Sequence, residues 1–177
     1  KKLISQLDEK CTLVLNLDNA PSQAWAQETR AKVLYFTRKD PMTLGIAEKF
    51  NGSYLKRPKI INKINGVEQS FDLMGSKLPG DHNKENFMAA ANAALSVGCS
   101  AQAIQRTILE FKGVEHRLEF TRRKDGVSIY NDSKATTAAA VARSLLSFNM
   151  PIILIAGGRD KDEAFTVLCD LVKKKVK

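Results

Sequence analysis

Residues 12–36 read TLVLNLDNAPSQAWAQETRAKVLYF, and this stretch decides the fold class. The apolar run from Thr12 to Leu17 predicts a short buried strand. A polar turn with helix-start signals follows at residues 18–22, and residues 23–30 predict a helix. Val33 to Phe36 predicts a second strand. A strand, a helix and a strand at this spacing form a βαβ unit, so we expect an α/β protein with a parallel sheet.

The next stretch changes character, from a helical signal to a hairpin signal. Thr43 to Phe50 is typical of a short helix. Asn65-Gly66 is a residue pair favoured in two-residue hairpin turns. The runs that flank it, residues 59–64 and 67–71, therefore predict two antiparallel strands added to or beside the sheet.

A helical pair is expected in the middle of the chain. Leu78-Pro79-Gly80 breaks the chain, and the alanine-rich stretch from Asn83 to Val97 predicts a helix that can pack closely on a sheet. Gly98 is expected to end this helix. Ser100 is expected to cap a second helix that runs to about Phe111.

Gly113 marks a candidate domain boundary. Beyond it we expect a hairpin of residues 117–123 and 127–131, with Asp125-Gly126 as its turn. A helix at 136–148 and a buried strand at 151–156 should follow. After a loop at 157–160 we expect a helix that starts at Glu163 and ends in the basic residues 172–177. This pattern predicts a second, unfinished βαβ unit. An α/β domain with only two parallel strands would be too small, so we expect the chain to be a piece of a larger protein.

The composition is that of an ordinary globular chain, with 44% hydrophobic and 27% charged residues among 177. No apolar run approaches the roughly 20 residues that span a bilayer, and the charged N-terminal residues do not resemble a signal peptide. The three cysteines lack a C-x-x-C spacing, which argues against a disulfide framework or a zinc site and favours a reducing compartment.

The net charge of +9 is compatible with nucleic acid, a membrane surface or a phosphorylated substrate. The basic residues are dispersed except at 122–124 and 173–175, a distribution that favours a solvated lysine-rich surface. His82 and His116 are the only histidines, and neither has a second ligand at metal spacing. We therefore expect no metal site made by this chain alone.

Two polar stretches near the middle of the chain are candidate binding sites. Asn83 and Asn86 lie three residues apart at a helix start, where two carboxamides can bind a nucleobase edge; the alternative is that Asp81 or Asn83 caps the helix. Arg117, in the run 115–119 beside the candidate boundary, can clamp a phosphate; the alternative is an ordinary surface ion pair.

Two further stretches lie in loops that follow predicted strands. Residues 131–136 read NDSKAT, with five polar residues in six, which is typical of a ligand-binding loop in an α/β domain. Residues 156–161 read AGGRDK, where paired glycines allow close backbone approach and Lys161 supplies a positive charge. The alternatives are a capped βα loop and a simple glycine turn. Neither a G-x-x-x-x-G-K-[ST] nor a G-x-G-x-x-G motif occurs in the chain.

The order of these stretches resembles the Mur ligases of peptidoglycan synthesis, and among them the D-glutamate-adding members. The strings that carry the resemblance are GDHNKENFMAAANAA (80–94), FKGVEHRLE (111–119), NDSKAT (131–136) and AGGRDK (156–161). It runs from about Thr12 to Phe165. It implies that residues 1–112 are the second half of a central ATPase-type parallel-sheet domain and that residues 113–177 begin a Rossmann-like C-terminal domain that binds the amino acid.

The resemblance also implies an activity. The intact protein would be a cytoplasmic, monomeric, ATP-dependent ligase that joins D-glutamate to UDP-N-acetylmuramoyl-L-alanine through an acyl phosphate. Asn83 and Asn86 would face the adenine, and Arg117 and Asp132 would hold the phosphates and ribose across the interdomain cleft. The D-glutamate carboxylates would lie near Lys134, Thr136 and Lys161. The phosphate-binding loop and the Mg²⁺ ligands would lie upstream of this chain, which alone would be inactive.

Two other hypotheses stay open at this point. One is another Mur-type or folylpolyglutamate-type ligase, which the amino acid accepted by the intact enzyme would distinguish. The other is a basic nucleic-acid-binding module, suggested only by the charge. The chain lacks the pattern of aromatic residues on which single-strand binders stack bases, so we expect no nucleic-acid partner. Because no apolar run is long enough to span a bilayer, we also expect no membrane partner.

Overall fold

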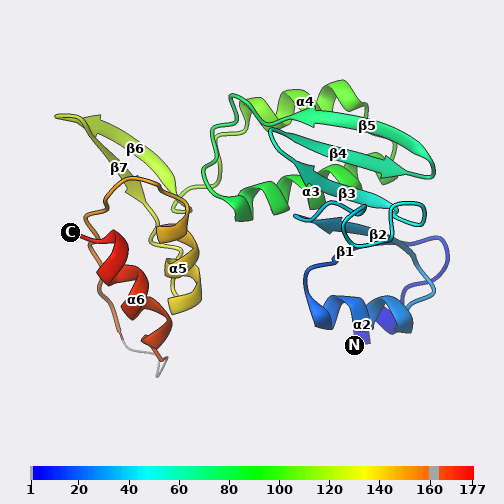
Figure 1. Ribbon diagram of the computed structural model, residues 1–177, viewed down its shortest axis with the longest axis horizontal. Helices are drawn as coiled ribbons and strands as arrows, with labels where there is room; N and C mark the ends of the chain where they lie inside the picture. Colours follow the sequence, from blue (N-terminus) through cyan, green and yellow to red (C-terminus); the bar gives the residue numbers. More distant parts are fainter. Residues whose placement is uncertain (1, 160–163) are drawn as a thin grey trace. The chain divides into compact units, whose positions relative to one another are not determined.

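A computed structural model describes residues 2–159 and 164–177 (Figure 1). The chain divides into two compact units. The first consists of the residues up to Ser76 together with Asn83–Glu110, and the second consists of Lys77–His82 together with the residues from Phe111 onward. The short segment 77–82 therefore belongs with the second unit, a grouping that the sequence did not suggest.

The first unit is built on a five-stranded sheet with the order β1-β2-β3-β4-β5. The strands are β1 (Thr12–Asn16), β2 (Lys32–Thr37), β3 (Gly52–Lys56), β4 (Lys59–Ile64) and β5 (Val67–Asp72). β1, β2 and β3 are parallel, whereas β4 and β5 are antiparallel to their neighbours. The predicted parallel βαβ unit and the predicted hairpin are confirmed, and the sheet is mixed.

Four helices belong to this unit or begin beside it. They are α1 (Lys2–Ser5), α2 (Ala20–Glu28), α3 (Asp81–Ser96) and α4 (Ala101–Glu110). Asn19 caps α2, its Oδ1 accepting from the Ser22 N–H at 3.2 Å. Ser100 caps α4 as predicted, its Oγ accepting from the Ala103 N–H at 3.3 Å.

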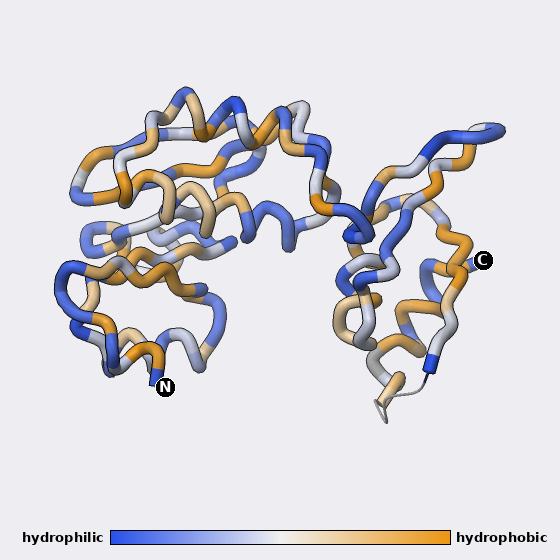
Figure 2. Tube along the Cα trace, turned by 180° about the vertical axis from the view of Figure 1, so that it is seen from behind, coloured by the Kyte–Doolittle hydropathy of each residue, from blue (hydrophilic) through white to orange (hydrophobic). Residues whose placement is uncertain are grey.

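The core of the first unit lies between the sheet and its helices. Ile60, Phe71 and Met88 are almost fully inaccessible to solvent. Ile60 and Phe71 are paired across β4 and β5, and Met88 comes from α3. Figure 2 shows hydrophobic stretches along the strands and hydrophilic residues at the turns, which is the pattern expected where strands contribute to a core.

The predicted helix from Thr43 to Phe50 is wrong, because this segment is a series of turns. The Gly45 N–H donates to Met42 O and the Ile46 N–H donates to Pro41 O, both at 3.1 Å. Gly45 has φ of +68°, a left-handed conformation that interrupts a helix. The segment leads into β3, a strand that the sequence pattern did not identify.

The second unit contains a hairpin and two helices. β6 (Glu119–Lys124) pairs with β7 (Val127–Asn131), and α5 (Ala138–Leu146) and α6 (Thr166–Lys175) follow. Asp125 and Gly126 both have positive φ, +49° and +82°, as the predicted two-residue turn requires. This hairpin is confirmed, and α5 begins after Thr137, whose Oγ1 accepts from the Ala140 N–H.

The predicted buried strand at residues 151–156 is also wrong. Ile153 is 75% exposed and Ile155 is 96% exposed. Within this segment only Ile152 forms a β-bridge, and its partner is Val176, in parallel orientation. The Ile152 N–H donates to Lys175 O, and the Lys177 N–H donates to Ile152 O, both at 2.9 Å. Among the described residues of this unit no other strand pairs with the segment. An apolar run forms a strand only where a neighbouring strand accepts its backbone hydrogen bonds.

The end of the chain differs from the prediction as well. α6 ends at Lys175, and Val176 is extended, so the predicted basic helix over residues 172–177 stops before the last two residues. The predicted helix start at Glu163 lies outside the described residues. With α6 between Ile152 and Val176, the second βαβ unit is represented among the described residues by a single parallel residue pair.

Candidate functional site

The first candidate group lies near the start of α3 (Asp81–Ser96). The Asn86 Nδ2 donates to Asn83 Oδ1 at 3.3 Å, and the Asn86 side chain is exposed while Asn83 is half-buried. Because α3 begins at Asp81, Asn83 is the third helical residue and not the N-cap. The two carboxamides are therefore paired with each other on the helix surface, where a nucleobase edge can reach Asn86.

This helix turn lies at the carboxyl ends of the parallel strands. Arg38 follows β2 directly, and its Nε lies 2.9 Å from Oε1 of Glu85, near the start of α3. Asp18, just after β1, accepts from Thr37 Oγ1 at 2.8 Å and from the Arg38 N–H at 2.9 Å. Ligands of open α/β sheets bind beyond this edge, which places the α3 turn in a suitable position for a ligand of the first unit.

The second candidate group, in the second unit, joins the turn 114–119 to the loop 131–137. The Lys134 N–H donates to His116 O at 3.0 Å. The Asn131 Nδ2 donates to His116 Nδ1 at 2.8 Å, and the His116 N–H donates to Glu119 Oε2 at 2.9 Å. Residues distant in sequence are thus held together by backbone and side-chain hydrogen bonds.

Asp132 is the residue that secures this junction. Its Oδ1 accepts from the Leu118 N–H at 3.0 Å, and its Oδ2 accepts from the hydroxyl of Ser144 on α5. Both carboxylate oxygens are therefore engaged inside the protein. The sequence predicted only a nucleotide contact for Asp132, and the structure adds a role in linking turn, loop and helix.

The remaining predicted side chains of the second unit are exposed. Arg117, Lys134 and Thr136 all lie on the surface of the turn 114–119 and the loop 131–137. Within residues 2–159 and 164–177, the Arg117 guanidinium forms no hydrogen bond or ion pair, so it can bind an anion without breaking an internal contact. Lys161, the third predicted D-glutamate residue, lies outside the described residues.

His116 is a member of this group that the sequence interpretation considered only as a metal ligand. Its ring is exposed, and its backbone has φ of +67°, which is uncommon for a residue with a side chain. Its Nδ1 lies 2.8 Å from Asn131 Nδ2 and 3.7 Å from Glu119 Oε2. Its place next to Arg117 in the sequence was the signal that could have identified it.

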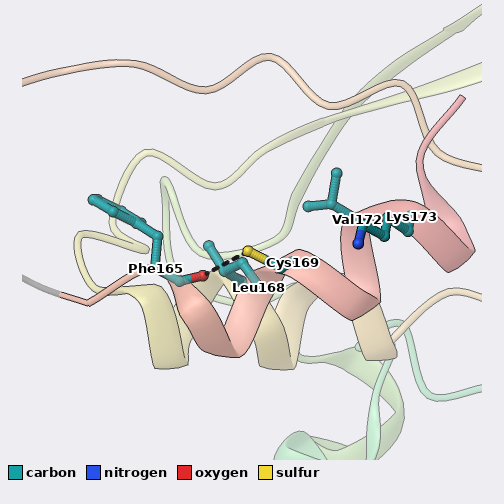
Figure 3. A pocket seen from close by; sticks show the side chains of 5 residues that line it. All are labelled: Phe165, Leu168, Cys169, Val172 and Lys173. Atoms are coloured by element: carbon teal, nitrogen blue, oxygen red, sulfur yellow. Dashed lines mark hydrogen bonds between the residues drawn. The ribbon is translucent and has the colours of Figure 1, made fainter.

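Two other features lie apart from these groups. A shallow pocket of about 380 Å³ lies along α6. Figure 3 shows the side chains that line it: Phe165, Leu168, Cys169, Val172 and Lys173. None of the predicted site residues lines it. Among the described residues no three metal-ligating side chains converge, and no helix combines the length and hydrophobicity needed to cross a bilayer.

Comparison with known proteins gives a consistent result. No family model matches the chain. The UDP-N-acetylmuramoylalanine–D-glutamate ligase of Caldicellulosiruptor saccharolyticus is 36% identical over 176 residues, which is 99% of this chain and 38% of that protein. The enzyme of the same name from Symbiobacterium thermophilum is 39% identical over 167 residues, 93% of this chain and 35% of that protein. This chain is homologous to the Mur ligases.

The fold agrees with this homology. The crystal structure of MurF from Acinetobacter baumannii superimposes with a TM-score of 0.61 over 84% of this chain and 32% of MurF, at 14% sequence identity. At that identity the likeness concerns the fold alone, and it identifies the mixed five-stranded sheet and its surroundings as part of the Mur ligase fold. The chain spans little more than a third of the length of the relatives that it matches.

Proposed function

We propose that the protein carrying this chain is an ATP-dependent ligase that joins D-glutamate to UDP-N-acetylmuramoyl-L-alanine in peptidoglycan precursor synthesis. The observation that carries the proposal is identity of 35–36% with D-glutamate ligases over 99–100% of the chain. The exposed side chains of Asn86, Arg117 and Lys134 in the two candidate groups suit a nucleotide and a dicarboxylate.

The reaction proposed has two steps. A carboxylate oxygen of UDP-N-acetylmuramoyl-L-alanine attacks the γ-phosphorus of ATP, and ADP leaves with the electron pair of the broken P–O bond. The amine of D-glutamate then attacks the resulting acyl phosphate, inorganic phosphate leaves, and the amine loses a proton. The protein's share in such chemistry is mainly positioning and charge stabilisation.

We propose these roles for the residues of this chain. Asn83 and Asn86 contact the adenine, since a carboxamide can both donate to and accept from a base edge. Arg117 binds the phosphates, and Asp132 contacts the ribose through lone pairs that its internal hydrogen bonds leave available. The D-glutamate carboxylates are bound by Lys134, Thr136 and Lys161, because cationic and hydroxyl donors form strong hydrogen bonds with carboxylates.

Magnesium, when bound, would neutralise charge on the phosphates. The described residues do not offer a convergent set of three metal-ligating side chains, so we assign no magnesium ligand to this chain. From the resemblance we also propose that the enzyme works as a monomer in the cytoplasm.

The proposal is tested with the full-length protein. Phosphate release from ATP should require both UDP-N-acetylmuramoyl-L-alanine and D-glutamate, and L-alanine or a diamino acid should not replace D-glutamate. The 177-residue chain should give no turnover on its own, because it has no G-x-x-x-x-G-K-[ST] loop to bind the β- and γ-phosphates. Turnover with a folate acceptor instead would favour the folylpolyglutamate-type alternative.

A further inference from the structure

Three polar side chains are buried beneath α3 and join this helix to the sheet. Ser53 of β3, Asn62 of β4 and Asn92 of α3 are each at most 1% exposed. The Asn62 Nδ2 donates to Ser53 Oγ at 2.9 Å and to Asn92 Oδ1 at 2.8 Å. The Ser53 hydroxyl also donates to Asn92 Oδ1. The Asn92 Nδ2 donates to the carbonyl oxygen of Tyr35 in β2, at 2.9 Å.

The sheet side of this network is held by the backbone. Ser53 and Asn62 are directly opposite each other in the antiparallel register of β3 and β4. Gly52 is paired with Tyr35, and a Cβ at Gly52, which has φ of +146°, would overlap the Tyr35 carbonyl oxygen. Glycine therefore allows the close approach of β3 to β2 beside the acceptor of Asn92.

The other buried residues of the α3 interface are apolar and less directional, and the ion pair of Glu85 with Arg38 lies at its partly exposed margin. Phe87, Met88 and Ala91 are buried on this helix. Apolar burial stabilises the contact but tolerates small shifts and rotations, whereas a hydrogen bond weakens steeply as its angle departs from linear. Among the buried side chains of α3, Asn92 thus supplies the directional contact that favours one position of the helix along and around its own axis.

The position of α3 determines where its first turn lies. Asn86 is six residues before Asn92, about 9 Å along the helix at 1.5 Å per residue. A helix of 16 residues transmits a shift or rotation at Asn92 to this turn. The exposed carboxamide of Asn86 would move with it, and misplacement of a binding group by about 1 Å can cost as much as 100-fold in activity.

We propose that Asn92 is a positioning residue for nucleotide recognition: by binding Tyr35, Ser53 and Asn62 beneath the sheet-facing side of α3, it fixes the carboxamides of Asn83 and Asn86 for the adenine. This inference rests on the proposed function, since it takes the ligand of the α3 turn to be ATP. Asn92 itself is fully buried and does not contact the nucleotide.

The test uses the full-length protein with Asn92→Ala, Asn62→Ala and the double variant, and with Ile108→Ala as the control. Ile108 is a buried residue of α4, so its truncation lowers stability without touching the network. For each protein we would measure thermal stability, equilibrium binding of ATP and of GTP, the KM for D-glutamate, and hydrogen exchange of the backbone amides at the start of α3.

Asn92→Ala should weaken ATP binding roughly 5- to 50-fold, the effect of losing one to two directional contacts, and should reduce the preference for ATP over GTP. The KM for D-glutamate should stay within about 2-fold of the original, a change within the ordinary scatter of surface effects. Asn62→Ala should weaken ATP binding in the same way, and the double variant should show less than the product of the two effects, because both act through one network.

The outcomes that contradict the proposal are specific. If Asn92→Ala and Ile108→Ala lower stability equally and neither changes ATP affinity or exchange at the start of α3, Asn92 is only a core residue. If the unaltered protein binds ATP and GTP equally, the adenine assignment itself fails and the positioning role fails with it. If it binds ATP selectively and Asn92→Ala has no effect, only the positioning role is overturned.

Discussion

Asp132 holds the backbone of Leu118 in place, its Oδ1 accepting from the Leu118 N–H at 3.0 Å. Leu118 has φ of +44°, a conformation that a leucine rarely adopts without support. The second oxygen of the same carboxylate accepts from Ser144 on α5. Asp132 therefore carries a structural role in addition to the nucleotide contact proposed for it.

Two substitutions separate these roles. Asp132→Ala should lower the free energy of unfolding by about 1–3 kcal/mol, because it leaves a partly buried N–H without its acceptor. Asp132→Asn should cost less, since its carbonyl oxygen can still accept from Leu118 and the Ser144 hydroxyl can reorient. Both should raise the KM for ATP. Urea unfolding and ATP kinetics on the full-length variants check this; an Asn variant with unchanged ATP kinetics would remove Asp132 from the nucleotide site.

The sequence predicts the elements of this chain that depend on residues close to one another in the sequence, and it fails where an element depends on residues far apart in the sequence. The hairpins at Asn65-Gly66 and Asp125-Gly126 were predicted because these residue pairs favour the left-handed backbone that a tight turn needs. The βαβ unit was predicted from local periodicity. In contrast, the apolar run that contains Ile153 and Ile155 is typical of a buried strand, yet both side chains are exposed. A strand needs a neighbouring strand to pair with, and the composition of one segment does not indicate whether that neighbour is present.

The candidate groups show the same division. NDSKAT and its neighbours could be picked out because polar residues gather after a predicted strand. The hydrogen bonds that join His116 to Lys134 and to Asn131 cross 15 to 18 residues, since 134 − 116 is 18 and 131 − 116 is 15. Likewise, the network around Asn92 reaches back to Tyr35, 57 residues away. A single sequence gives no signal for such pairings.

Asn86→Leu should weaken ATP binding by about 1–3 kcal/mol in the full-length enzyme, because the base would lose a hydrogen-bonding partner. The KM for D-glutamate should change little. Gln102→Leu is a matched control, since it removes an exposed carboxamide from the first turn of α4. Titration calorimetry with ATP measures the effect, and equal affinities in the two variants would leave Asn86 without a nucleotide role.

Gly80→Ala should destabilise the second unit through a steric clash. Gly80 has φ of +90°, and a Cβ there would lie well inside contact distance of Ser147 Oγ and close to the His82 ring. Gly45→Ala provides the control, because Gly45 also has positive φ but no atom lies within 4 Å of its Cβ position. We expect Gly80→Ala to cost about 1–3 kcal/mol more than Gly45→Ala, the typical cost of overpacking.

The clash can be tested by a second substitution. Ser147→Ala removes the hydroxyl oxygen that the new methyl group would meet, so the double variant should regain part of the stability lost in Gly80→Ala. The comparison uses the denaturant midpoints of five full-length proteins: the unaltered protein, Gly80→Ala, Gly45→Ala, Ser147→Ala and the Gly80→Ala/Ser147→Ala double variant. If Gly80→Ala and Gly45→Ala cost the same, backbone conformation alone explains the effect and the contact with Ser147 carries none of it.

Tyr54 should make stability pH-dependent on the alkaline side. Burial raises the pKa of its phenol above the ordinary value of 10.0, and the negative charges of Glu68 and Asp40 raise the pKa further. The phenol ionises first in the unfolded chain, so its contribution to stability is complete below pH 10.0 and is lost as the pH rises through the folded-state pKa. Tyr54→Phe keeps the ring packed on Phe50 and removes the ionisation.

The measurement is the loss of unfolding free energy between about pH 9 and about pH 11, a window around the ordinary tyrosine pKa. The unaltered protein should lose more than Tyr54→Phe. Subtracting the tyrosinate absorbance of the variant gives the titration of Tyr54 itself, which should lie above that of a free tyrosine. A difference curve centred at or below the ordinary value would show that this phenol is not shielded from water.

Substitution of Lys161 gives the sharpest test of the proposed amino-acid site, and the proposed role of this residue depends on the sequence alone. It follows Gly157-Gly158 just after the apolar run 152–156, and a desolvated dicarboxylate needs cations near it. Lys161→Ala in the full-length enzyme should raise the KM for D-glutamate by about 10- to 150-fold, equivalent to about 1.5–3 kcal/mol, and should leave ATP binding nearly intact. Lys161→Arg should restore only part of the affinity, because the planar guanidinium is bulkier than an ammonium group.

Lys174→Ala removes an exposed lysine of α6 and serves as the control. Steady-state kinetics that vary D-glutamate and ATP separately decide the question, since a Lys161→Ala enzyme with the D-glutamate KM of the control would identify Lys161 as a solvated loop residue.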